Sequence, residues 1–202
     1  VEQGAALGTG HAVRTGYDAA ASEDDRLATA GREPALVWLA DAYITPETFA
    51  GLAAHPAENA VTVARYDDGE PYGHRVDLDP ERAAVTRVWK GQSPYVETGS
   101  WKLSAAALRT MAPAPGTAGP RAATPASKGE TPPAPDSADP GAAVPGPDGE
   151  YRALPALQRL IEAGETIGYV ETPEWIHLGG TKPSPEYHLR RVFATLAPEL
   201  NT

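Results

Sequence analysis

The stretch Leu7-Gly8-Thr9-Gly10-His11-Ala12-Val13 is followed along the chain by Ala35-Leu36-Val37-Trp38-Leu39-Ala40-Asp41. In the first stretch, a glycine-rich turn opens a helix that we expect over residues 10–20. Backbone at such a turn can approach a phosphate or a base closely. The second stretch is a continuous apolar run that predicts a strand buried on both faces, as in parallel sheets, and it ends on one aspartate. Together they predict a nucleotide site on an α/β sheet, with a carboxylate placed to bind a metal ion.

The segments that follow continue the alternation of helix and strand signals. Thr45-Pro46-Glu47 has the order of a helix start, and we expect that helix to run to about Ala54. An antiparallel hairpin is predicted from two alternating runs joined by Asp79-Pro80. The remaining expected strands are 60–66, 95–103, 166–170 and 175–180, and the remaining helices are 104–111, 154–161 and one that opens at Pro183.

Residues 112–149 differ from the rest of the chain in composition. They hold ten of the 21 prolines and no aromatic residue, and Val144 is their one large aliphatic side chain. Such a segment buries too little apolar area to offset the entropy of ordering it. We therefore predict a disordered Pro/Ala-rich insertion at 112–149, which separates two parts of one α/β domain, 1–111 and 150–202.

The charge and residue usage exclude several classes of function. The formal net charge is −10, which argues against nucleic acid or an anionic membrane surface as a partner. The chain has no cysteine, so thiolate catalysis, disulfides and cysteine-based zinc sites are excluded. No apolar run approaches a membrane span and no signal peptide is visible, so we expect a cytoplasmic protein. The Ala/Gly/Pro/Arg-rich usage is typical of a bacterium with a GC-rich genome.

The order of the motifs resembles the sugar-phosphate nucleotidyltransferases, and most closely the uridylyltransferases that act on N-acetylglucosamine 1-phosphate. Glu2-Gln3 with Leu7–Val13 is similar to the family's E-Q-x-x-L-G-T-G-H-A stretch, and Val37–Asp41 is similar to its strand ending in Gly-Asp. Pro71-Tyr72-Gly73 and Glu97-Thr98-Gly99 stand where the family has its Tyr-Gly turn and Asn-x-Gly. The further similar stretches are 157–164, 168–170 and Trp175-Ile-His-Leu-Gly, the last like the family's W-x-D-x-G.

The resemblance implies a three-layer, Rossmann-like α/β domain with a mostly parallel sheet. It also implies transfer of a nucleoside monophosphate from a nucleoside triphosphate to a sugar 1-phosphate, with release of pyrophosphate and Mg²⁺ as cofactor. Carried over residue by residue, it assigns the nucleotide to Gly8, Thr9 and Gly10, the sugar to Tyr72, Gly73, Glu97 and Thr98, the metal to Asp41 and His177, and catalytic roles to Asp41 and Lys90.

The sequence departs from the family at several of these positions. The family's N-terminal phosphate loop is not found, so we expect the first βα units to lie before Val1. His177 takes the place of the second metal aspartate, Trp89 that of the glutamate in E-K-P, and Glu97 that of the asparagine. Mg²⁺ favours oxygen over imidazole, so a histidine at that position would weaken its binding.

Each assignment has a plainer alternative. Asp41 could simply begin a turn, the glycines could form a tight loop, His177 could pack at a strand edge, and Lys90 could be a solvated surface charge. Two functions therefore stay open beside the transferase: a degenerate module that binds a nucleotide or nucleotide-sugar, and a cytidylyltransferase acting on a phosphorylated non-sugar. A homo-oligomer is one arrangement that the sequence leaves open.

Overall fold

The computed structural model describes residues 8–23, 34–65, 74–89, 93–113 and 151–177. The chain divides into two compact units, each built from two separate stretches of sequence. The first unit comprises residues 1–35 and 103–165, and the second comprises 36–102 and 166–202. Apart from Ala112 and Pro113, the predicted insertion 112–149 lies outside the described residues, and so does the helix expected to open at Pro183.

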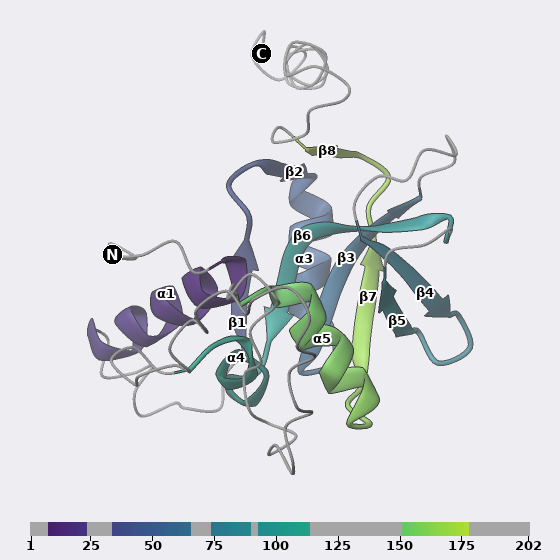
Figure 1. Cartoon of the computed structure of the whole chain (residues 1–202). Coiled ribbons are helices and arrows are strands. Elements are labelled where there is room, and N and C mark those ends of the chain that lie inside the picture. Colours follow the sequence, from purple (N-terminus) through teal and green to yellow (C-terminus); the bar gives the residue numbers. More distant parts are fainter. Residues whose placement is uncertain (1–7, 24–33, 66–73, 90–92, 114–150, 178–202) are drawn as a thin grey trace, which may run out of the picture. The chain divides into compact units, whose positions relative to one another are not determined.

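The first unit is a cluster of three helices, α1 (Thr9–Glu23), α4 (Ala105–Met111) and α5 (Ala153–Glu162), which pack on one another (Figure 1). All three were predicted from the sequence, and α4 begins where expected, because the hydroxyl of Ser104 accepts a 3.2 Å hydrogen bond from the amide of Ala107. The core of this unit includes Leu108, Met111 and Leu157, which are fully buried.

The second unit contains a small barrel. The strands are β1 (Ala35–Trp38), β2 (Ala42–Ile44), β3 (Asn59–Arg65), β4 (Arg75–Asp79), β5 (Ala84–Trp89), β6 (Tyr95–Leu103), β7 (Ile167–Glu171) and β8 (Trp175–His177). The main sheet has the order β1-β6-β3-β7-β5-β4, and β4 also pairs with β6, so that β6, β3, β7, β5 and β4 form a closed ring. The barrel core is apolar and includes Val61, Val76, Val96 and Ile167, all fully buried.

The fold is α/β as expected, but the expectation of a mostly parallel sheet is wrong. Within the ring only β3 and β7 run parallel, and the pairings β3–β6, β4–β5, β4–β6 and β5–β7 are antiparallel. A sheet closed on itself has an inside and an outside, so it does not present two open faces for two layers of helices. In this unit α3 (Pro46–Ala54) packs against β3 and β7 (Figure 1).

The strand that suggested a parallel sheet is not buried on both faces. Along β1, partly buried and exposed residues alternate, and Leu36 and Trp38 are 42% and 54% exposed. A short apolar run in the sequence does not show whether the strand lies in the centre of a sheet or at its edge. β3, by contrast, is buried from Asn59 to Ala64 and lies inside the sheet. It has the central, buried position that we expected for β1.

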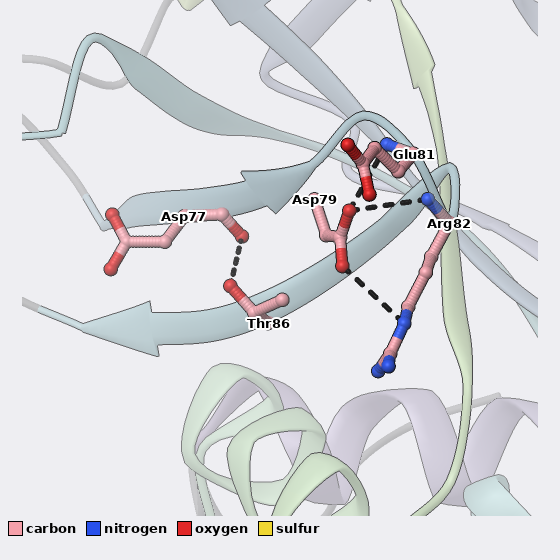
Figure 2. Close-up of polar contacts among 5 residues, drawn as sticks. All are labelled: Asp77, Asp79, Glu81, Arg82 and Thr86. Atoms are coloured by element: carbon pink, nitrogen blue, oxygen red, sulfur yellow. Dashed lines mark hydrogen bonds and ion pairs between the residues drawn. The ribbon is translucent and has the colours of Figure 1, made fainter.

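The hairpin predicted around Asp79-Pro80 is confirmed as β4 and β5, which pair antiparallel (Figure 2). Asp79 shapes the turn, because its Oδ1 accepts hydrogen bonds from the amides of Glu81 (3.0 Å) and Arg82 (3.2 Å). Its Oδ2 also lies 3.6 Å from Nε of Arg82. Across the hairpin, the hydroxyl of Thr86 donates to the carbonyl of Asp77 at 3.1 Å. The hairpin is thus fixed by local hydrogen bonds.

The start of α3 was predicted correctly, whereas the strand β2 before it was not predicted from the sequence. The hydroxyl of Thr45 accepts a hydrogen bond from the amide of Thr48 at 3.3 Å, and Pro46 occupies the first helical position. A buried contact between the hydroxyls of Thr48 and Thr172 (3.2 Å) then ties this helix to the segment between β7 and β8. None of the helices in the described ranges is long and apolar enough to cross a membrane.

Candidate functional site

Asp41 lies on a tight turn between β1 and β2. The turn is closed by a 3.1 Å hydrogen bond from the amide of Ala42 to the carbonyl of Leu39. The indole of Trp38 donates a further bond of 2.6 Å to the carbonyl of Ala42, and its ring lies 5.7 Å from that of Phe49. The turn is also bonded to β6, because the amide of Leu39 donates to the carbonyl of Gly99 at 2.9 Å. Asp41 is therefore carried by a restrained segment of backbone.

The part of β6 that receives this turn is a bulge. In the register of β3 with β6, Val61 faces Trp101 and Val63 faces Glu97, so residues 98–100 stand opposite Thr62 alone. Thr62 makes two hydrogen bonds to this bulge. Its hydroxyl donates to the carbonyl of Ser100 at 3.1 Å and accepts from the hydroxyl of Thr98 at 2.6 Å. Thr62, Thr98 and Ser100 are all fully buried, so these bonds are shielded from water.

Gly99 at the centre of the bulge is required by both conformation and space. Its φ is +82°, a region that side-chain-bearing residues rarely adopt. A Cβ at this position would lie 3.0 Å from Cδ1 of Leu39 and 3.3 Å from Cβ of Ala42. The glycine therefore lets the Asp41 turn rest directly against the backbone of β6.

Glu97 joins both sides of the bulge. One of its carboxylate oxygens, Oε1, accepts hydrogen bonds of 2.5 Å from the amide of Gly99 and from the indole of Trp101. Burial raises the pKa of Glu97 to about 7, and the bonds from Gly99 and Trp101 counteract part of that rise. The sequence assigned Glu97 to the sugar, and that role stays a prediction. The structure adds that one of its oxygens already binds its own strand.

Strand pairing places the backbone of His177, one of the two residues assigned to a metal, beside the neighbour of the other. β2 and β8 are antiparallel, and the Cα of His177 is paired with that of Ala42, the residue next to Asp41. Within the described part of the chain, however, no three His, Asp or Glu side chains are grouped so as to hold a metal ion. The residues present fit a Mg²⁺ site with a single protein ligand, the carboxylate of Asp41. Oxygens of a substrate phosphate and of water would supply the other ligands.

The glycine turn assigned to the nucleotide belongs to the first unit, where its groups bond to the start of α5. The amide of Gly10 donates to the carbonyl of Tyr151 at 2.7 Å, and the hydroxyl of Thr9 accepts from the amide of Ala153 at 3.3 Å. A Cβ on Gly10 would lie 2.7 Å from the carbonyl oxygen of Met111. Close helix packing is thus sufficient to explain a glycine here, and the nucleotide role remains a prediction.

Other assigned residues contribute less to the described geometry. Lys90, Tyr72 and Gly73 lie outside the described residues. The hydroxyl of Thr98 points to Thr62. Sequence reasoning missed Thr62 and Trp101 as partners of the bulge. The signal available for Thr62 was a lone hydroxyl in the otherwise apolar run of β3, and Trp101 had no signal beyond its place in a strand.

Comparison with known proteins supports the fold. No protein-family model matches the chain, and no curated protein sequence matches it. Among solved structures, the chain is similar to the UDP-glucose pyrophosphorylase from Acinetobacter baumanii, with a TM-score of 0.58 and 15% identity over 96% of this chain. It is also similar to the inositol-1-phosphate CTP transferase from T. maritima, with a TM-score of 0.49 and 10% identity over 78% of this chain. The chain spans 58% and 54% of the lengths of these two proteins.

Proposed function

We propose that the chain is part of a nucleotidyltransferase that transfers a nucleoside monophosphate from a nucleoside triphosphate to a sugar 1-phosphate and releases pyrophosphate. The observation that carries the proposal is the placement of Asp41 on a turn locked to β6, with the backbone of His177 paired to the neighbouring residue. The fold shared with the UDP-glucose pyrophosphorylase and the resemblance of the motifs in their order support the same reaction class.

The reaction asks for positioning and charge neutralisation more than for covalent chemistry. A phosphate oxygen of the acceptor attacks the α-phosphorus in line, and pyrophosphate leaves. Asp41 would hold Mg²⁺, and the bound ion would neutralise charge on the phosphates. The restrained turn around Asp41 suits this task, because it fixes the backbone that carries the carboxylate before substrate binds. By the resemblance of the motifs, Lys90 would supply charge to the phosphates, Gly8–Gly10 would contact the nucleotide, and Tyr72, Gly73 and Thr98 would lie on the side of the sugar. We leave Glu97 out of the sugar contacts, because its Oε1 is bonded within β6.

A second function is favoured by a separate observation. The amide of Gly10, the hydroxyl of Thr98 and one oxygen of Glu97 all bond within the protein. Because these groups already bond within the protein, they can make fewer contacts to substrate than the transferase hypothesis requires of them. The second candidate is therefore a module that binds a nucleotide or nucleotide-sugar without turnover.

An assay of pyrophosphate release by the whole protein tests the proposal. The assay pairs each of the four nucleoside triphosphates with several sugar 1-phosphates, and pairs CTP also with a phosphorylated polyol. Release that requires Mg²⁺ and a sugar 1-phosphate is the expected result, whereas release only with the polyol assigns a non-sugar acceptor. Absence of release, together with saturable binding of a nucleotide-sugar by calorimetry, assigns the binding module. Absence of both overturns both candidates.

A further inference from the structure

We propose that Glu97 is a positioning residue, whose carboxylate holds the bulge at 98–100 in the shape that seats the turn carrying Asp41. The role of Asp41 in this inference rests on the proposed function. The two hydrogen bonds between Glu97 and the bulge, which we call the Glu97 tie, do not depend on the proposed function and have a test of their own.

The two bonds of Glu97 are possible only because the strand bulges. Glu97 and Trp101 are four residues apart, and along a regular strand they would be separated by about 13 Å. In this structure one oxygen of Glu97 accepts from both the indole of Trp101 and the intervening amide of Gly99. The carboxylate thus closes a loop within β6, and opening that loop would let the strand straighten.

The bulge transmits its shape directly to the Asp41 turn. Gly99 receives the hydrogen bond from the amide of Leu39, and Leu39 and Ala42 stand at the van der Waals limit above it. The amide of Gly99 is bonded to Glu97, whereas its carbonyl is bonded to Leu39. One residue therefore links the carboxylate of Glu97 to the backbone that presents Asp41.

This arrangement differs from that of a carboxylate used as a ligand. A metal or sugar ligand needs its charge, or its oxygens, directed at the bound group. A tie needs reach and an acceptor oxygen, and charge only strengthens it. Glutamine keeps the reach and the acceptor but lacks the charge, and aspartate keeps the charge but is one methylene shorter. The two substitutions consequently separate the two roles.

The test compares Glu97→Gln and Glu97→Asp with the wild-type chain, and uses Glu171→Gln, at an exposed strand position, as the matched control. Hydrogen exchange of the Leu39 amide, followed by NMR, reports the seating of the turn without any need for activity. We expect Glu97→Gln to preserve the protection of Leu39, and Glu97→Asp to lower it by about tenfold. In the pyrophosphate assay Glu97→Asp should lower kcat on the order of 100-fold, with a smaller effect on KM for the triphosphate, and Glu97→Gln should keep kcat near the wild-type value.

The inference is overturned if Glu97→Asp protects Leu39 as well as the wild-type chain does, or if glutamine fails where aspartate succeeds, because the latter pattern belongs to a ligand. A wild-type chain with no turnover but with the expected exchange pattern overturns the proposed function and leaves the tie intact. If Glu97→Asp does not fold, Trp101→Phe removes one of the two donors instead. Unchanged protection of Leu39 in a folded Trp101→Phe variant then counts against the proposal.

Discussion

The amide of Gly10 donates a 2.7 Å hydrogen bond to the carbonyl of Tyr151, so the first turn of α1 touches the backbone just before α5. These two residues are 141 positions apart (151 − 10) and lie in the same compact unit. The contact leaves no room for a side chain, because a Cβ on Gly10 would also lie 2.9 Å from the carbonyl oxygen of Tyr151. A glycine expected to serve a ligand therefore has a packing role of its own.

Gly10→Ala should destabilise the protein, because both oxygens near the new methyl group belong to backbone that cannot rotate away. We expect a loss of about 1–3 kcal/mol in the free energy of unfolding, measured by urea denaturation. Gly16→Ala is the matched control, since the same helix has nothing within 4 Å of a Cβ at that position. The control should gain about 0.5–1 kcal/mol. Equal effects of the two substitutions would contradict the close contact.

Thr62→Val should weaken the bulge in β6 from the opposite strand. Valine removes the hydroxyl and leaves the carbonyl of Ser100 and the hydroxyl of Thr98 buried without that partner. We expect a loss of about 1–3 kcal/mol in the free energy of unfolding, together with faster exchange of the Leu39 amide. Thr62→Ser keeps the hydroxyl and serves as the control. If valine and serine have the same effect on Leu39, the hydroxyl does not hold the bulge.

The elements that the sequence predicted well are those with local signals. The cap at Thr45, the cap at Ser104 and the turn at Asp79 each consist of bonds between residues two or three positions apart. Such signals can be recognised in a few neighbouring residues, and the starts of α3 and α4 and the hairpin of β4 and β5 followed from them.

Closure of the barrel and the bulge could not be predicted in this way. The ring closes because β4 pairs with β6 as well as with β5, and no local pattern encodes a second partner. The bulge depends on Thr62 and Glu97, which are distant in sequence and meet only through the register of β3 with β6. Glu97 was assigned to the sugar from the resemblance alone, and its two bonds within its own strand were not anticipated.

The raised pKa of Glu97 predicts that stability falls as pH rises. The pKa of Glu97 is about 7 in the folded chain, because burial disfavours the charged carboxylate. In the unfolded chain it has the usual value for a glutamate, near 4.5. Between these values the folded chain binds a proton that the unfolded chain does not, so the free energy of unfolding decreases with pH. The contribution is fully present below about pH 4.5, and it is lost as pH rises through about 7.

Glutamine does not titrate, so Glu97→Gln should flatten this dependence. Urea unfolding at pH 5 and pH 8 gives the loss of stability for each chain. The loss should be larger in the wild type than in Glu97→Gln by up to about 3 kcal/mol, the upper bound set by the shift in pKa. Comparing the two differences removes the contributions of all other titrating groups. Parallel pH profiles for the two chains would mean that Glu97 titrates as an ordinary carboxyl group.

Asp41→Asn should strongly reduce Mg²⁺-dependent pyrophosphate release, because the amide keeps the size of the side chain but loses the charge that would hold the ion. We expect kcat to fall on the order of 100- to 1,000-fold, as for the loss of one preorganised electrostatic group. The restraints on the turn come from Leu39, Trp38 and Gly99, so the protection of the Leu39 amide should be retained. Glu58→Gln, at an exposed position in the same unit, should keep wild-type kcat. Wild-type turnover in Asp41→Asn would exclude Asp41 as the metal ligand, whereas lost turnover with lost protection of Leu39 would show that the carboxylate maintains the turn.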